Sequence, residues 1–199
     1  MSSFWDYVGT FWSDSDTFWN YFRPLFGGGL LIGTITGLVG FRARIIRPRD
    51  RVAGDVLRIV HRDRRRWITL AAGSVTLCVG IALWHGPLGA AERLARAIEA
   101  DARATAVAWE VPQIRAQLDR RPLTRRLILS GPADDFQRSE LVRTMETLPG
   151  VSRAAWSAKP AGPPLLLEGT LAALLGFLIG LGLAYLVELR RRYNAQWNW

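Results

Sequence analysis

The residues with reactive side chains are few, and no group of them has the spacing that catalysis or metal binding requires. Glu168 is the one ionisable residue inside a long apolar segment, His85 directly follows another such segment, and Cys78 is the only cysteine. A carboxylate within a membrane span is a functional-site hypothesis, and a neutral imidazole can bind a metal or the magnesium of a pigment. The sequence offers no second ligand, no glycine-rich phosphate loop and no nucleophile–base set beside them. We therefore expect no catalytic residue, no metal site and no cofactor.

The positions of these residues favour structural roles. Glu168 lies near the outer end of its apolar segment, where a carboxylate can reach lipid headgroups or water. His85 follows Trp84 at the end of a segment, which favours an interfacial imidazole. Cys78 has no partner for an intrachain disulfide, and we expect it to be a small buried apolar residue.

The composition differs from that of a soluble globular protein. The chain has 199 residues, of which 49% are hydrophobic, yet it carries a formal net charge of +9. The two kinds of residue separate into long apolar runs and arginine-rich blocks, as in proteins of the bilayer. The densest basic block lies between two apolar runs. We therefore expect this block to reflect membrane topology, and we expect no nucleic-acid partner.

Three apolar segments are predicted to be transmembrane helices, namely residues 24–41, 67–84 and 163–187. The first contains no charged residue, and its length corresponds to about 27 Å of helix, close to the thickness of the hydrocarbon core. The second begins at Trp67 and ends at Trp84, and tryptophan at both ends is typical of interfacial anchors. Residues 1–22 lack the basic start and cleavage site of a secretory signal, so we expect the first span to be retained.

The arginines predict the direction of the spans. Residues 42–66 form a short arginine-rich loop, and the tail 188–199 carries three consecutive arginines just beyond the third span. The positive-inside rule places both segments in the cytoplasm. The acidic N-terminal tail and residues 85–162 then lie outside, which in a bacterium is the periplasm. The sequence thus predicts a multi-pass protein of the bacterial inner membrane with a periplasmic N-terminus and a cytoplasmic C-terminus.

Residues 1–23 form an aromatic N-terminal tail in which Phe-Trp pairs recur every seven residues. Seven residues make about two helical turns, so Trp5, Trp12 and Trp19 fall on one face of a helix. We expect an interfacial helix on the outer leaflet, with these tryptophans acting as anchors together with Trp67 and Trp84. Packing of the tail on a partner protein, a lipid or a pigment is the alternative.

Glycines recur every four residues inside two of the spans, at Gly29, Gly33 and Gly37 and at Gly176 and Gly180. This spacing places them on one helix face, where another backbone can approach closely. We expect these faces to pack against a neighbouring helix. The pattern leaves open whether that neighbour belongs to this chain or to another subunit.

Residues 85–162 are expected to form a small domain outside the membrane. Residues 88–107 have the apolar spacing of a helix, and residues 127–129 make a short buried strand. A turn at Gly131-Pro132 precedes a second helix over residues 136–148, capped by Asp134 or Asp135. Residues 151–157 then form a closing strand.

The end of this domain resembles a BON domain. The resemblance covers residues 127–156 and is carried by a strand that ends in Ser-Gly, a turn, a helix with a polar start, and Leu-Pro-Gly-Val before a strand. Its motif residues here are Ser130, Gly131, Pro149, Gly150 and Val151. The resemblance implies a small periplasmic α/β module that binds phospholipid surfaces or envelope proteins and is no catalyst. BON-like parts occur in some OmpA-family proteins, but the peptidoglycan-binding domain of those proteins has no counterpart in this sequence.

Together these features predict three transmembrane α-helices plus a small α/β extramembrane domain, and a function without catalysis. The leading hypothesis is an accessory or scaffolding subunit of a bacterial inner-membrane complex, whose partners are membrane lipid, other integral membrane subunits and a periplasmic envelope protein. One alternative is a stand-alone envelope binding protein whose domain binds phospholipid or a periplasmic partner. Another alternative is a supernumerary subunit of a photosynthetic or respiratory supercomplex.

Overall fold

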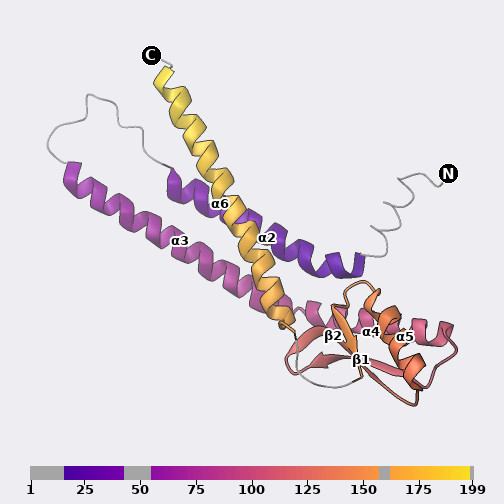
Figure 1. The fold of residues 1–199 in the computed structure, drawn as a ribbon. Coiled ribbons are helices and arrows are strands. Elements are labelled where there is room, and N and C mark those ends of the chain that lie inside the picture. The colour runs from indigo at the N-terminus through magenta and orange to yellow at the C-terminus, as the bar shows by residue number, and fades with distance from the viewer. Residues whose placement is uncertain (1–15, 43–54, 157–161, 198–199) are drawn as a thin grey trace, which may run out of the picture. The chain divides into compact units, whose positions relative to one another are not determined.

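The computed structural model describes residues 16–42, 55–156 and 162–197 (Figure 1). In chain order they form α2 (Asp16–Phe41), α3 (Asp55–His85), α4 (Ala90–Ala108), β1 (Arg115–Arg120), β2 (Leu123–Ser130), α5 (Asp135–Glu146), β3 (Arg153–Ala155) and α6 (Leu165–Trp197). The chain divides into two compact units. The helical unit comprises Pro24–Leu83 and Thr170–Trp199, and the sheet-containing unit comprises Met1–Arg23 and Trp84–Gly169.

Three helical stretches are long and apolar enough to cross a membrane: Phe18–Phe41, Arg64–Ala108 and Leu165–Asn194. Each overlaps one of the three predicted spans, so the prediction of three candidate transmembrane helices is confirmed. By length and composition the chain is a candidate multi-pass membrane protein.

The helices extend beyond the apolar segments from which they were predicted. α2 begins at Asp16, and Pro24, the expected first residue of the span, lies inside the helix. α3 begins at Asp55, within residues that we expected to form a loop, and α6 continues to Trp197 through the expected tail. Arginine, alanine, leucine and glutamate all favour helix, so the helical backbone continues after the apolar composition ends. Hydropathy therefore located the apolar part of each helix and not its ends.

The sheet-containing unit is built around a three-stranded mixed sheet in the order β1-β2-β3. β1 and β2 form an antiparallel pair in which Leu118 lies opposite Leu127. β3 joins β2 in parallel, with Leu127 opposite Ala154, and α5 provides the crossover that a parallel connection requires. The predicted α/β character of this domain is thus confirmed, whereas β1 was not predicted.

The core of this unit lies where α4 and α5 cover the sheet. Its largest fully buried side chains include those of Ile98, Leu127, Leu129, Leu141 and Met145. Burial of apolar surface of this kind contributes about 25 cal/mol per Å², and it is the dominant favourable term in folding. The strand that the sequence predicted at residues 127–129 is the buried part of β2.

The start of α5 agrees with the local sequence signal. The Asp134 side chain accepts a hydrogen bond from the Gln137 backbone N–H at 2.7 Å, and the Gln137 side chain accepts one from the Asp134 N–H at 3.3 Å. This reciprocal pair is a capping box, which satisfies backbone donors that the first helical turn leaves without partners. Of the two predicted caps, Asp134 is therefore the residue that caps the helix.

The end of α4 is a Schellman motif with an unusual residue at its left-handed position. The Glu110 N–H donates to the Val107 carbonyl at 3.0 Å, and the Val111 N–H donates to the Ala106 carbonyl at 3.0 Å. Glu110 has a φ of 57°, and among the described residues it is the one non-glycine residue with positive φ. A side chain in this conformation costs roughly 1–2 kcal/mol, which is why glycine usually occupies the position.

Replacing Glu110 by glycine is expected to stabilise the sheet-containing unit by about 0.5–1 kcal/mol, because relief of the left-handed strain outweighs the added freedom of the unfolded chain. The measurement is the Tm of the purified chain in detergent. Glu110→Ala is the matched control, since it removes the carboxylate but keeps Cβ, and it should leave the Tm nearly unchanged. A lower Tm for Glu110→Gly would show that the Glu110 side chain makes a stabilising contact that outweighs the strain.

Candidate functional site

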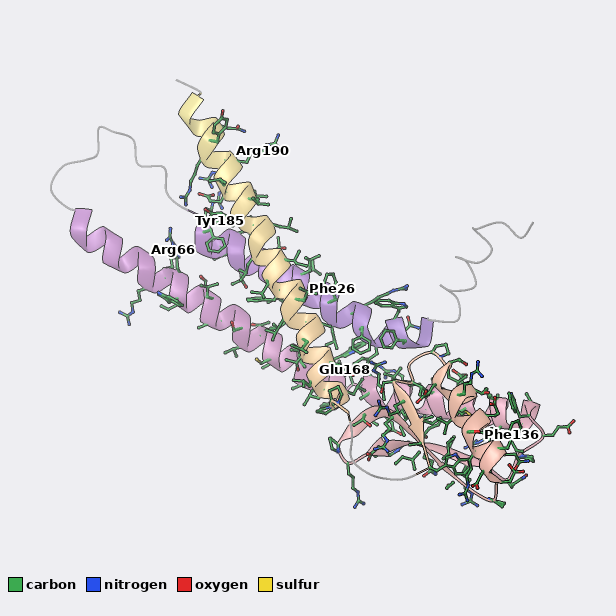
Figure 2. All side chains as sticks on the ribbon, viewed as in Figure 1. Phe26, Arg66, Phe136, Glu168, Tyr185 and Arg190 are labelled. Carbon is green, nitrogen blue, oxygen red and sulfur yellow. The ribbon has the colours of Figure 1, made fainter. Side chains whose placement is uncertain are left out.

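Two of the three residues that stood out for their chemistry, Glu168 and His85, lie at one end of the sheet-containing unit, where its segments of α2, α3 and α6 are found. Figure 2 labels Glu168 at the start of α6. We call this group the juxtamembrane cluster. Its members are Phe18, Tyr21, Trp84, His85, Arg125 and Glu168.

Glu168 forms an ion pair with Arg125 of strand β2. Arg125 Nε donates to Glu168 Oε2 at 2.5 Å, and Arg125 Nη2 donates to Oε1 at 3.3 Å. The two side chains are only 21% and 18% exposed, so solvent screens this pair less than a surface pair. Two parallel bonds between a guanidinium and a carboxylate also fix the relative orientation of the groups. The structure thus gives Glu168 a structural partner in strand β2, which the sequence did not indicate.

Further contacts of Arg125 connect this ion pair to two other segments. The Phe18 ring of α2 lies 5.1 Å from the Arg125 guanidinium, within the range of a cation–π interaction. Arg125 Nη1 donates to the Gly150 carbonyl at 3.5 Å, and the Ser152 N–H donates to the Arg125 carbonyl at 2.8 Å. Arg125 thus joins α2, α6 and the loop before β3, although sequence reasoning gave it no role.

Two glycines among the predicted motif residues, Gly131 and Gly150, have backbone conformations that a side chain rarely adopts. Gly131 has a φ of 137°, and a Cβ at this position would lie 2.9 Å from the Gln113 carbonyl oxygen. Gly150 has a φ of 91°, and a Cβ there would lie 2.8 Å from Ile98 Cδ1. Both residues therefore serve turns that must pass close to a neighbour. Of the other motif residues, Ser130 ends β2, and Pro149 and Val151 flank Gly150 between α5 and β3.

His85 is engaged with Tyr21. The Tyr21 hydroxyl and His85 Nδ1 are hydrogen-bonded at 2.8 Å, and the Trp84 indole N–H donates to the Tyr21 carbonyl at 3.1 Å. These two bonds join α2 to the end of α3. Trp84, one of the predicted interfacial anchors, is half-buried, and its indole N–H is bonded within the chain.

A second charged network covers the outer strand of the sheet. Arg120 donates to Glu92 and Glu99 of α4 at distances of 3.0–3.1 Å, and the Leu118 N–H donates to Glu99 at 3.0 Å. Hydrogen bonds to Glu92, which has the larger effect, and to Glu99 raise the pKa of Arg120 above its ordinary value. Because the Arg120 side chain is 47% exposed, the network contributes more to the position of α4 than to stability. The bond from the Leu118 N–H to Glu99 also makes this N–H of the edge strand β1 unavailable for pairing with another strand.

The glycines of the spans pack within this chain, in the helical unit. A Cβ built on Gly29 or Gly33 would collide with the backbone of Ala173 or Phe177, respectively. The same holds in the other direction, because Cβ atoms on Gly176 and Gly180 would collide with the carbonyl groups of Phe26 and Leu30. A Cβ on Gly37 would lie 2.5 Å from that of Ala184. The neighbour that the sequence left open is thus the chain's own helix, since α2 packs on α6.

The predicted anchors have different environments. Trp67 is 72% exposed and Trp19 is 37% exposed, as expected of side chains that face an interface. Trp5 and Trp12 lie outside the described residues. Cys78, which we expected to be buried, is exposed on α3.

The contacts of the juxtamembrane cluster hold segments of this unit together. In the part of the chain that the structure describes, no three His, Cys, Asp or Glu side chains are grouped so as to hold a metal ion. The one carboxylate and the one imidazole of the cluster are both bound to partners that fix their orientation. A scan against protein-family models, a search of curated proteins and a search of solved structures each found no match.

Proposed function

We propose that this chain is a non-catalytic accessory or scaffolding subunit of a bacterial inner-membrane protein complex. The observation that carries the proposal is that the side chains best suited to chemistry make structural contacts, Glu168 with Arg125 and His85 with Tyr21. A catalytic acid or base needs a proton-transfer position open to substrate. Side chains that instead hold a small domain to the ends of helices are typical of a protein whose role is to contact other proteins.

The surface left for partners supports this role. Because the glycine faces of α2 and α6 pack on each other, contacts with other subunits are expected through other faces. In the candidate span Arg64–Ala108, 17% of the apolar 18-residue stretch is buried, whereas the share is 28% in each of the other two candidate spans. α3 exposes Val75 and Ile68 at 62% and 58%. Without a strong hydrophobic driving force between helices in lipid, such a face binds either lipid or a neighbouring helix by close packing.

The direction of the chain is part of the proposal. Residues 42–66 and 190–192 are rich in arginine, and the positive-inside rule favours the cytoplasm for both segments. On this proposal the three-stranded sheet and its helices lie in the periplasm. The resemblance of residues 127–156 to a BON domain supports a contact role for this domain, since the resemblance implies binding of envelope proteins or phospholipid. Gly131 and Gly150, two residues that carry the resemblance, both have positive φ.

The test is affinity purification of the tagged chain from its native membrane in a mild detergent, with quantitative mass spectrometry. The proposal predicts a fixed set of membrane proteins recovered in constant molar ratio to the chain. Membranes that hold the untagged chain give the background. Recovery of the chain without such a set would contradict the subunit role and favour a stand-alone envelope binding protein.

A further inference from the structure

Three large apolar side chains of the sheet-containing unit are exposed at the end opposite the juxtamembrane cluster. Val107, Trp109 and Phe136 are 58%, 48% and 75% exposed. Figure 2 shows Phe136 on the side of this unit remote from Glu168. We call these three residues the apolar tip. Single exposed apolar residues are common, but three at one end of a small domain need an explanation.

The backbone brings the apolar tip together. Arg120 at the end of β1 pairs with Glu92 in the first turn of α4. This pairing shows that α4 and β1 run in opposite directions. The end of α4 and the start of β1 therefore lie at the same place. Arg115 pairs with Ser130, so β2 also ends there, and α5 begins a few residues later. At the opposite end, Thr124 is bridged to Pro164 just before α6.

The charge at this end has the opposite sign to that of the whole chain. Residues 107–115 and 130–137, which form this end, contain three acidic residues and one basic residue, Arg115. The acidic residues are Glu110, Asp134 and Asp135, and all three are exposed. The net charge of these two segments is thus −2, from three negative charges and one positive, whereas the chain carries +9.

We infer that the apolar tip, together with an acidic rim formed by Glu110, Asp134 and Asp135, is the docking surface for a partner subunit. The partner subunit binds through a segment that carries apolar and basic side chains. This inference rests on the proposed function and adds the surface and the chemistry of the partner. Charge complementarity of this kind selects partners and orients them. A second copy of this chain docked tip to tip would place two acidic rims against each other. Anionic lipid headgroups would likewise repel the rim.

The first test is the double variant Trp109→Ser/Phe136→Ser in the tagged full-length chain, purified from its native membrane. Aromatic side chains often dominate an interface, so recovery of partner subunits should fall about tenfold or more relative to the tagged chain. Both side chains are exposed, and the Tm of the variant should stay close to that of the wild type. Leu88→Ser is the matched control, because Leu88 is 55% exposed at the other end of the domain. It should leave partner recovery unchanged.

The charge is tested separately with Glu110→Lys/Asp135→Lys, which should also reduce recovery. Asp101→Lys is its control, because Asp101 is an exposed acidic residue on α4 away from the tip. Wild-type chain that brings no partner would overturn both this inference and the proposed function. Wild-type chain with partners that the tip variants retain would overturn this inference alone.

A photoreactive phenylalanine analogue at position 136 identifies what covers the tip. The expected crosslink joins a peptide with basic and apolar residues from one of the co-purified subunits. Crosslinks to lipid or to a second copy of this chain would instead overturn the inference. The same analogue at position 88 reports contacts of the other end of the domain.

Discussion

The variant Gly33→Ala is expected to lower the free energy of unfolding by about 1–3 kcal/mol, because the added methyl group would overpack a backbone contact. A Cβ at Gly33 would lie 2.9 Å from Phe177 Cα and closer still to the Phe177 carbonyl oxygen. These are backbone atoms, which cannot move aside by changing a rotamer. α2 and α6 must therefore separate or shift along each other, and packing along the whole glycine face is weakened.

Gly28→Ala is the matched control for this prediction. Gly28 lies on the same helix, but a Cβ there would meet nothing within 4 Å. Because alanine favours helix over glycine by about 1 kcal/mol, this variant should be neutral or more stable. The measurement is the Tm of each variant in one detergent, followed by intrinsic tryptophan fluorescence. Equal effects of the two substitutions would show that α2 and α6 do not meet at these glycines.

The variant Arg125→Ala is expected to cost roughly 1.5–3 kcal/mol, the range for hydrogen bonds to charged groups, because it leaves the Glu168 carboxylate half-buried without its guanidinium. It also removes the cation that lies over the Phe18 ring and the donor to the Gly150 carbonyl. The loss should appear as a lower Tm and as faster hydrogen exchange of amides in β2 and β3.

Two further variants separate the ion pair from a general effect of losing an arginine. Arg121→Ala removes an exposed arginine of the neighbouring turn and should change the Tm little. Arg125→Ala/Glu168→Ala removes both partners, and it should be less destabilised than the sum of the two single variants. Strictly additive effects would indicate that Arg125 and Glu168 do not stabilise each other.

The parts of the fold that could be predicted from sequence are those set by local composition. Long apolar stretches located the three candidate spans, and the two aspartates at the start of α5 narrowed its cap to Asp134 or Asp135. β1 escaped prediction because Arg115–Arg120 has no apolar alternation and buries only Leu118. The end of α4 escaped as well, because Glu110 occupies a position where the expected signal is glycine.

The candidate site was predictable only in part, because its contacts join residues far apart in the chain. The position of Glu168 in an apolar run indicated that the residue matters, but its partner lies 43 residues earlier in the sequence. Arg125 was not singled out by the sequence, because β2 also contains the adjacent Arg126, and only residues 127–129 of the strand are apolar in succession. Glycine spacing likewise predicted close packing, whereas only the three-dimensional arrangement identifies α6 as the partner of α2.

Native mass spectrometry of the particle extracted from its own membrane can decide whether this chain works as a subunit. We expect a particle much heavier than the 22.3 kDa chain, which releases this chain and other membrane proteins in fixed stoichiometry on activation. A particle that contains one copy of this chain with bound detergent or lipid, and no other protein, would rule out the subunit role.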